Sequence, residues 1–532
     1  MNYKRASFPR EPLSLLYMKK QILLFISACI LTLAACSVVL RFVLFDMAYE
    51  YDELFTAITA DPSLSLKWIY HNWLIVDVHP PLYNILMWCY THFCPYGPEL
   101  WLRLPSLIFG IGALFCSWYF FPKHFGKSSR LLFTAWIGCN TYMILYSQQA
   151  RSYSLVLLLS VCLTFCFLNM VRTLFQKKPI SLGQWGIFAG LALMLEWCHY
   201  FGTLLVGIFC AFLFVFALKN KQKLKFFMII PLGLGIACLP WLIPNFLMQL
   251  KFQRLDGNWW ANTYSLSDAP AVFLRIFFYS FWGKCWGGIL FFVGLIGRIL
   301  RYKRTGSWGP YFREITVLGG VLAVVFCVTF AISFKTYMFV GRYFTVVLPA
   351  GYLLLILLWK PLYDKYLLMK LACVVVLSLE LLSFASLYKV LKEPNVISSR
   401  IVSQFYRDYL KKREIMVVAM EAFPPSAMPA MYGFYVNKVY GLNARITELF
   451  SLSEQERDKY LKKQDKAFVY MPNCSEEKLY SLSRLWNRQV EIYMRLGETC
   501  ILHFNIKGSG PLDSYEYQQA HRHKSWFWGY GS

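Results

Sequence analysis

The sequence predicts a mainly α-helical, polytopic membrane protein that carries a small α/β domain at its C-terminal end. Of its 532 residues, 57% are hydrophobic and only 16% are charged, whereas a soluble domain is usually about 25% charged. Apolar runs of about 18–25 residues, long enough to cross ~30 Å of hydrocarbon, recur as far as residue 390. Basic residues gather in short tracts between these runs, and the alternate loops are acidic or nearly uncharged.

The basic tracts predict the topology, because Lys and Arg are enriched in cytoplasmic loops. Tracts at 122–130, 172–179, 219–225 and 298–304 are then cytoplasmic, with the N-terminus inside and everything after residue 391 outside. The net charge of +25 is thus explained by topology, and no nucleic-acid partner is expected. About eleven transmembrane helices fit, near residues 21–45, 101–121, 131–147, 153–171, 181–198, 201–218, 226–247, 272–297, 315–333, 343–359 and 367–390.

Two long outer loops interrupt this pattern, at residues 46–100 and 248–271. The segment 79–97 of the first loop is apolar but short, and Pro80 and Pro81 favour a helix start. If it crossed the membrane, every later loop would change sides. We therefore expect interfacial helices in the first outer loop.

The chain divides into a transmembrane domain, residues 1–391, and an extracytoplasmic soluble domain, residues 392–532. The second part is more charged and contains strand-like runs at 414–420, 466–472 and 500–506, with helical patterns at 451–463 and 475–496. Alternating strands and helices predict a small α/β domain. It shows no metal, phosphate-loop or nucleophile motif, which favours binding or shielding over catalysis. Its cysteines, Cys474 and Cys500, are candidates for a disulfide that the pattern does not require.

Polar and ionisable residues collect at the predicted outer ends of the spans. Each one alone can be explained as an interfacial anchor. Acids, histidines and arginines from distant loops on one face instead predict a site that takes a proton from one group and stabilises negative charge on another. The residues are Asp52, Glu53, His79, Arg103, Gln148, Gln149, Arg151, Tyr153, His199, Tyr200, Lys335, Arg342 and Tyr343.

Several of these residues lie in motifs with a recognisable order. The stretches are "YDELFTAI" (51–58), "HPPLY" (79–83), "WLRLPS" (101–106), "YSQQARSYSLVLL" (146–158) and "GRYFTVVLPAGYLL" (341–354). Together they resemble the polyprenol-phosphate-sugar-dependent glycosyltransferases of the GT-C fold, and most closely the family 39-like group of protein mannosyltransferases and aminoarabinose transferases. The resemblance covers residues 20–250 and the 341–354 motif, but not the C-terminal domain.

The resemblance implies a membrane glycosyltransferase that moves a sugar from a polyprenyl-phosphate donor to a hydroxyl acceptor, with inversion, on the extracytoplasmic side. Asp52 corresponds to the catalytic aspartate and would act as general base. Glu53 would raise the pKa of its neighbour or contact the acceptor or a metal. Arginines suit the leaving phosphate because their planar fork matches its oxygens. The donor-phosphate candidates are Arg151, Arg342, Arg103 and Lys335, and the substrate-binding candidates are His79, Gln148, Gln149, Tyr153, His199, Tyr200 and Tyr343.

A metal requirement is doubtful, and the metal site is unknown. Related enzymes often carry a carboxylate in the second short outer loop, where this chain has Gln148 and Gln149. If a divalent cation bridges two loops in those enzymes, this chain lacks the second ligand. No cofactor is otherwise expected.

The expected partners are the polyprenyl-phosphate sugar donor, the lipid bilayer, and a glycan, lipid or protein acceptor. The expected location is the plasma (inner) membrane, as part of cell-envelope glycosylation. Two alternatives remain: a flippase or transporter of lipid-linked sugars, and an O-antigen ligase or polymerase. A transporter would favour paired halves with broken helices at mid-membrane, whereas here the polar groups gather in outer loops.

Overall fold

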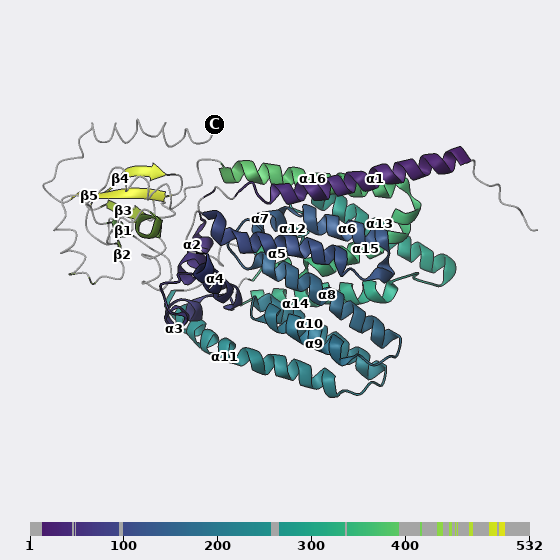
Figure 1. Cartoon of the computed structure of the whole chain (residues 1–532), viewed down its shortest axis with the longest axis horizontal. Helices are drawn as coiled ribbons and strands as arrows, with labels where there is room; N and C mark the ends of the chain where they lie inside the picture. The colour runs from purple at the N-terminus through teal and green to yellow at the C-terminus, as the bar shows by residue number, and fades with distance from the viewer. Residues whose placement is uncertain are drawn as a thin grey trace, which may run out of the picture.

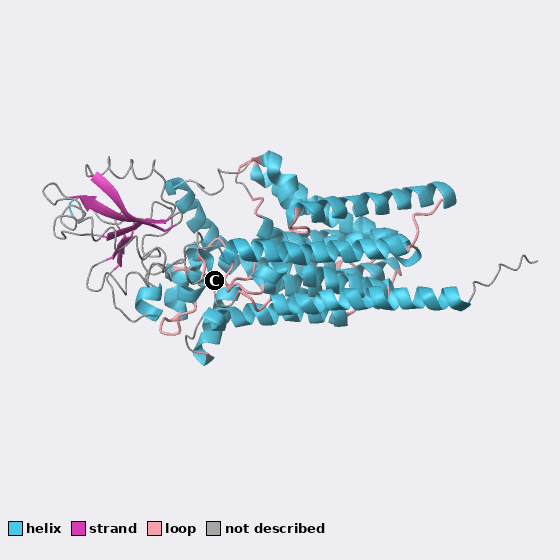
Figure 2. Cartoon of the chain, turned by 90° about the horizontal axis from the view of Figure 1, so that it is seen from above, coloured by secondary structure: helices cyan, strands magenta, loops and turns pink. Residues whose placement is uncertain are grey.

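The structure of the chain, a computed structural model, describes residues 13–44, 47, 49–94, 99–256, 265–335 and 338–392, and in the tail 415–417, 434–439, 446–448, 453, 455, 468–471, 489–496 and 499–505. Within these residues, long helices run side by side in an elongated bundle, and a five-stranded sheet lies beyond one end of it (Figure 1). The second view shows the same arrangement, with the strands well separated from the long helices (Figure 2).

The long helices confirm a multi-pass membrane protein. In the described part of the chain, nine helices are long and apolar enough to cross a membrane. Many large apolar side chains remain exposed on them, including Phe25, Leu232 and Phe246, as is usual for surfaces that face lipid. These helices are α1 (Leu13–Leu40), α5 (Glu99–Tyr119), α8 (Tyr153–Phe175), α10 (Tyr200–Lys219), α11 (Lys225–Asp256), α13 (Phe281–Thr305), α14 (Phe312–Ser333), the short η4 (Gly341–Val347) continued by α15 (Leu348–Lys365), and α16 (Leu367–Lys392).

Two of the eleven predicted spans form shorter helices. The predicted span 131–147 is divided into α6 (Lys127–Cys139) and α7 (Thr141–Tyr146). Asn140 causes the break: its side chain accepts a hydrogen bond from the Met143 amide and donates to the Ile276 carbonyl and the Tyr352 hydroxyl. The predicted span 181–198 is the 15-residue α9 (Leu182–Glu196).

Other boundaries also differ from the prediction. The predicted span 272–297 is interrupted, because residues 276–280 separate α12 (Ala269–Arg275) from α13. The short η3 (Leu266–Asp268) precedes α12. The predicted loop 248–271 starts later than expected, since α11 continues to Asp256 despite Pro231, Pro240 and Pro244 within it. A short η2 (Lys123–Phe125) precedes α6.

Two segments lie at the centre of the bundle and carry site residues at their ends. In α8 and in η4–α15, 78% of the residues in the most apolar stretch are buried. Aromatic rings fill the space nearby, with Trp136 packed against Phe278, Tyr352 and Trp359 at centroid distances of 5.4, 5.2 and 5.8 Å. A rigid core therefore fixes the start of α8 and the η4 turn.

The first outer loop contains the predicted helix and three further short ones: α2 (Tyr51–Thr59), α3 (Leu66–Asn72), η1 (Leu74–Val76) and α4 (Leu82–Phe93). Pro81 directly precedes α4, as its fixed backbone angle favours. Trp88 of α4 donates to the Leu64 carbonyl at 3.0 Å, and Thr91 donates to the Ala60 carbonyl at 2.5 Å. Helix α4 thus supports the turn that follows α2, and these helices lie between the bundle and the sheet (Figure 1).

The tail contains a mixed sheet of five strands: β1 (Ile415–Val417), β2 (Ile446–Glu448), β3 (Phe468–Met471), β4 (Gln489–Leu496) and β5 (Thr499–Asn505). The strand order is β2-β1-β3-β5-β4, with β1 parallel to β2 and β3, and β5 antiparallel to β3 and β4. The three predicted strands are confirmed, and β2 was missed. The predicted helix 475–496 is wrong at its end, where β4 pairs antiparallel with β5. The predicted helix 451–463 falls mostly outside the described residues, as does Cys474.

Candidate functional site

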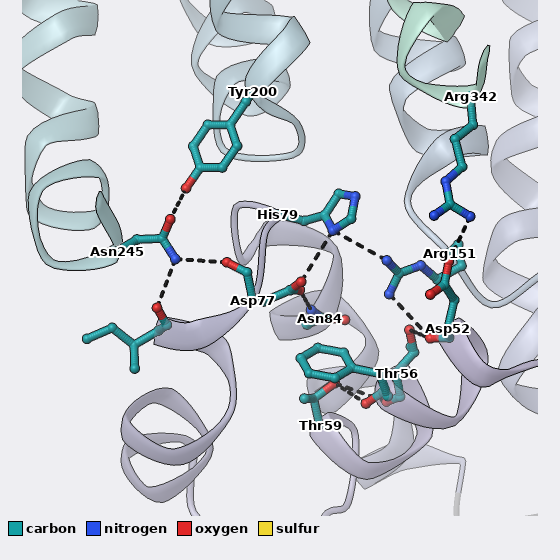
Figure 3. A network of polar contacts seen from close by, with 12 residues as sticks. Asp52, Thr56, Thr59, Asp77, His79, Asn84, Arg151, Tyr200, Asn245 and Arg342 are labelled. Atoms are coloured by element: carbon teal, nitrogen blue, oxygen red, sulfur yellow. Dashed lines mark hydrogen bonds and ion pairs between the residues drawn. The ribbon is translucent and has the colours of Figure 1, made fainter. Parts of the chain in front are cut away.

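The residues that begin α2 face a second cationic segment far along the chain. Arg342, in η4, donates from Nη1 to Oδ2 of Asp52 at 2.9 Å (Figure 3). Both side chains remain about one-third exposed, at 33% for Asp52 and 38% for Arg342. The predicted base and a predicted phosphate ligand therefore meet in an ion pair that solvent and small molecules can reach.

Arg151 approaches the same helix from the loop before α8. Its Nη1 donates to the backbone carbonyl of Asp52 at 3.3 Å, and its Nη2 lies 3.4 Å from Nδ1 of His79. Its side chain is buried, with an exposed fraction of 7%. Within the described residues, Nε of Arg151 and Nε of Arg342 have no hydrogen-bond partner. Two guanidinium groups with donors to spare thus converge on Asp52, Arg342 on its carboxylate and Arg151 on its backbone carbonyl.

A chain of polar contacts continues from His79 to residues that the sequence analysis missed. The Asp77 carboxylate lies 3.3 Å from Nδ1 of His79 and accepts from Asn84 at 3.4 Å. Asn245, in α11, donates to the carbonyls of Asp77 and Ile75, both at 2.8 Å. The spacing of an acid two residues before "HPP" could have pointed to Asp77; nothing in the sequence around Asn245 singles it out.

Tyr200 lies at the far end of this chain of contacts. Its hydroxyl donates to the side-chain carbonyl of Asn245 (Figure 3). The same hydroxyl accepts from Trp241 Nε1 at 3.1 Å. Both contacts hold α10 against α11, the helix whose Asn245 bonds to the first outer loop. The predicted substrate-binding role of Tyr200 is therefore not supported by its position, which is that of a structural group one layer behind His79.

Glu53 and Arg103 form a second, buried ion pair. Arg103 donates to both carboxylate oxygens of Glu53, at 2.7 and 2.6 Å, and to the carbonyls of Leu44 and Met47. The exposed fractions are 1% for Glu53 and 2% for Arg103. Glu53 also accepts from the amides of Ala150 at 2.7 Å and Glu50 at 3.0 Å.

This geometry corrects two predictions. A guanidinium whose donors already bind a carboxylate and two carbonyls is not available to a donor phosphate, so Arg103 does not fit its predicted role. Glu53 likewise has no oxygen directed to a substrate, because both accept from Arg103 and from backbone amides. The adjacent acids therefore differ completely in environment: Asp52 is accessible and Glu53 is internal.

The loop that carries Arg151 is held along its length by the segment around the end of α1. Arg41, itself fully buried, donates to Ser147 at 3.2 Å. Gln148 accepts from the Leu44 amide at 2.7 Å and donates to the Ile144 carbonyl at 3.1 Å. Both ends of the Gln148 amide are thus bonded to backbone groups, so its contacts indicate support of the backbone and do not favour its predicted substrate-binding role. Gln149 instead reaches Glu50, at 3.0 Å.

Aromatic and imidazole rings enclose the inner side of the site. The His79 and His199 rings lie 5.4 Å apart, and Tyr343 packs against both, at 6.1 and 5.2 Å. Tyr153 lies 6.1 Å from His199, and Arg342 sits over the Tyr153 ring at 5.8 Å. His199 precedes α10 and accepts from the Phe201 amide through Nδ1, at 3.1 Å. The Nε2 atoms of His79 and His199 are buried and lack a hydrogen-bond partner among the described residues.

The charges of the site control the ionisation of its acid. Burial alone would raise the pKa of Asp52, but the positive charges of Arg151, Arg342 and His79 outweigh it and lower that pKa below its usual value. Burial, followed by the charges of His79, Arg342 and Arg151, lowers the pKa of His199 well below its ordinary value. At neutral pH Asp52 is therefore ionised and His199 is uncharged, which leaves its Nε2 as a hydrogen-bond donor.

Two further predictions concern residues outside this cluster. Lys335 is exposed at the end of α14, and among the described residues its side chain has no contact with Arg151, Arg342 or Asp52. No group of three or more His, Cys, Asp or Glu side chains in the described part of the chain could hold a metal ion.

The arrangement is suited to two tasks. An ionised, accessible carboxylate can take a proton from a hydroxyl. Arginine donors without partners, beside a neutral imidazole donor, can bind an anion and stabilise charge that develops on it. Both groups meet at the end of the bundle where the first-loop helices lie (Figure 1).

Solved structures with a similar fold include two of ArnT from Cupriavidus metallidurans. The structure bound to undecaprenyl phosphate has a TM-score of 0.54 at 13% identity and covers 91% of this chain and 99% of that chain. The apo structure has a TM-score of 0.54 at 12% identity, with the same coverage. No family model matches the sequence, and no curated protein matches it. The predicted GT-C fold is thus confirmed, whereas the finer family 39-like assignment remains a prediction.

Proposed function

We propose that the protein is a membrane glycosyltransferase that moves a sugar from a polyprenyl-phosphate donor to an acceptor hydroxyl. The observation that supports this most is the convergence of two arginines on Asp52, with Arg342 paired to its accessible carboxylate and Arg151 bonded to its backbone carbonyl. A similarly folded protein, ArnT, has been solved with undecaprenyl phosphate bound. The positive-inside pattern supports an active site on the extracytoplasmic side of the plasma membrane, together with residues 392–532.

The reaction would be a single displacement. The acceptor oxygen attacks the anomeric carbon, the bond between that carbon and the phosphate oxygen breaks, and Asp52 takes the hydroxyl proton. One base on the acceptor side gives inversion at that carbon. The departing polyprenyl phosphate gains negative charge, which Arg151 and Arg342 would stabilise.

The Asp52–Arg342 contact suggests how the base becomes active. An aspartate beside two guanidiniums is a weak base, because its pKa is lowered. A donor phosphate would draw Arg342 and Arg151 toward itself, since charge-assisted bonds to phosphate are strong. Asp52 would then lose its cationic partner and gain basicity once the donor is bound, which favours donor binding before acceptor attack.

Glu53 and Arg103 would support this site from behind. Their buried pair ties α2 to α5 and, through the Ala150 amide, to the loop of Arg151. Both are therefore proposed as positioning residues. Tyr153, Tyr343, His79 and His199 are proposed to contact the donor, and Gln149 and Glu50 to face the acceptor side.

The decisive experiment measures transfer of labelled sugar from polyprenyl monophosphate donors in detergent, over a panel of sugars and acceptors, for the wild-type chain and for Asp52→Asn. We expect covalent transfer that depends on Asp52. Movement of donor across a reconstituted bilayer without covalent transfer would indicate a flippase. Transfer that requires a polyprenyl diphosphate donor would indicate a ligase or polymerase.

A further inference from the structure

The tail contributes one short helix, η5 (Phe434–Val439), that reaches the first outer loop. The ring of Phe434 packs edge-on against Tyr49, with centroids 5.9 Å apart and an interplanar angle of 63°. Both side chains are buried, at 4% and 6% exposure. Tyr49 lies two positions before the first residue of α2, so this contact fixes the backbone that leads into the helix of Asp52.

A second contact of η5 lies beyond the other end of α2. Lys438 Nζ lies 2.7 Å from Oδ2 of Asp61, whose side chain is only 8% exposed. Asp61 also accepts from the amide and hydroxyl of Ser63, at 2.9 and 2.6 Å. Burial alone would raise the pKa of Asp61, but the bonds from Lys438 and Ser63 lower it. Among the described residues, Lys438 is the cation that pairs with this nearly buried acid.

The two contacts come from one turn of one helix. Phe434 and Lys438 lie four positions apart in η5, a π-helix whose hydrogen bonds join residues five apart. Together they contact Tyr49 and Asp61, the residues that flank α2 on its two sides. The Tyr49 ring also lies 5.3 Å from the guanidinium of Arg103, which binds Glu53. The path from Phe434 thus passes through Tyr49 and Arg103 to the residue next to Asp52.

We propose that Phe434 and Lys438 are positioning residues for Asp52, so that the tail holds the helix of the catalytic base in its working orientation. This proposal rests on the proposed function only in assigning the base to Asp52. A small misplacement of a reacting group is costly, about 10²-fold in rate for ~1 Å. A clamp at both ends of a nine-residue helix is therefore enough to affect turnover strongly.

The test compares Lys438→Ala, Lys438→Arg, Phe434→Leu and the charge-reversed pair Asp61→Lys with Lys438→Asp, all in the full chain. Lys360→Ala serves as the matched control, because it also breaks an ion pair of 2.9 Å, here with Asp364. Both residues lie near the C-terminal end of α15, whereas Arg342 lies just before its N-terminal end. For each variant, kcat, the donor KM, the melting temperature and the amide hydrogen exchange of residues 51–59 are measured.

We expect Lys438→Ala to lower kcat by about tenfold, to leave the donor KM near the wild-type value, and to speed amide exchange in α2. Lys438→Arg and the charge-reversed pair should keep most of the wild-type kcat and most of the slow amide exchange in α2. Lys360→Ala should change neither kcat nor that exchange. Phe434→Leu should speed exchange in α2 without unfolding the chain, since it keeps an apolar side chain.

Unchanged exchange in α2 and unchanged kcat in both Lys438→Ala and Phe434→Leu would overturn the proposal. A charge-reversed pair that stays as impaired as Lys438→Ala would also overturn it, because the ion pair would then not be the cause. Should the wild-type chain transfer no sugar at all, the proposed function fails, whereas the exchange data still decide whether η5 holds α2.

Discussion

The carboxylate of Asp52 and the guanidinium of Arg342 lie 2.9 Å apart although 290 positions separate them in the chain. The neighbouring acid, Glu53, forms its own pair with Arg103 at 2.6 Å, and that pair is almost fully buried. Two successive residues of α2 therefore bind two different arginines, one at the surface of the site and one inside the protein. We therefore expect Asp52 to act in catalysis and Glu53 to support the fold, and substitution of each acid can distinguish the two roles.

Replacement of the accessible acid should stop catalysis without unfolding the chain. In Asp52→Asn the side chain keeps its size but cannot accept the proton, so turnover should fall by about 10²–10⁴-fold. The melting temperature should change little, because an ion pair that is one-third exposed contributes only ~0–1 kcal/mol. Single-turnover transfer and thermal unfolding on the same preparation test this. Wild-type turnover in Asp52→Asn would mean that another group is the base.

Replacement of the buried acid should have the opposite effect. Glu53→Gln leaves Arg103 charged, buried and without a carboxylate, and breaking a buried ion pair from one side costs about 3–5 kcal/mol. We expect a clear loss of thermal stability, partly recovered in the double variant Glu53→Gln with Arg103→Met, which removes the charge. Differential scanning calorimetry in detergent measures this. If Glu53→Gln instead melts like the wild-type chain yet transfers no sugar, Glu53 has a chemical role that its contacts do not show.

Arg151 should matter for the donor more than for the fold. Arg151→Ala removes two contacts, to Asp52 and His79, and the donor-phosphate contact proposed above. Charge-assisted hydrogen bonds contribute about 1.5–3 kcal/mol each, so kcat/KM for the donor should fall roughly ten- to hundredfold. Arg151→Lys should recover only part, because one ammonium does not reproduce a planar fork. Equal kcat/KM in folded Arg151→Ala and wild-type protein would assign Arg151 a purely structural role.

The ion pair of Asp52 also predicts a pH dependence. A lowered pKa means that Asp52 is a functional base down to about pH 4 or below, given an ordinary aspartate value of ~3.9. Arg342→Ala should raise that pKa, so the acid limb of kcat/KM should move to higher pH, whereas Arg342→Lys keeps the charge and should move it little. The same pair stabilises the fold above the pKa of a free aspartate, and this stabilisation is lost as the pH falls through the lowered value.

The profile of kcat adds a check on the donor. The pH profile of kcat reports the pKa of the base in the complex with substrate, whereas that of kcat/KM reports it in the free protein. If the donor phosphate draws Arg342 away from Asp52, the acid limb of kcat should therefore lie at higher pH than the acid limb of kcat/KM. If the acid limbs of the kcat and kcat/KM profiles coincide in the wild-type protein, Asp52 keeps its cationic partners when the donor is bound.

Much of this fold could be predicted from the sequence because a bilayer imposes a simple rule on span length and composition. The exceptions are informative. Asn140 divides a predicted span by bonding to residues more than 100 positions away, Ile276 and Tyr352. Such partners are set by packing and leave no local signal. The strand β4 was misread for a similar reason, since pairing with β5 decides its conformation rather than its helix-like composition.

The site was predicted less completely. The motifs identified Asp52, Arg151, His79 and Arg342, which the structure brings together. The motifs could not show which of the predicted site residues are accessible and which are buried. Glu53 and Gln148 have the same polar character in the sequence as their neighbours Asp52 and Gln149. That distinction depends on which oxygen accepts from which amide, as Glu53 does from Ala150 at 2.7 Å. Asp77 was missed although it lies two residues before "HPP", and Asn245 was missed because its importance comes only from contact with the first-loop backbone.

The last prediction uses the two nitrogen atoms of His199 separately. Nδ1 accepts from the Phe201 amide at the start of α10, whereas the buried Nε2 has no partner among the described residues. His199→Asn should keep the first contact, because asparagine is a good helix N-cap, and lose only the Nε2 donor. His199→Ala loses both, and should cost a further ~0.5–2 kcal/mol of stability. We therefore expect similar increases in donor KM for the two variants but a lower melting temperature only for alanine. Since the lowered pKa of His199 keeps it neutral in the folded chain, wild-type stability should also decline as the pH falls below ~6.5, and less so in His199→Asn. An unchanged donor KM in His199→Asn would restrict His199 to capping α10.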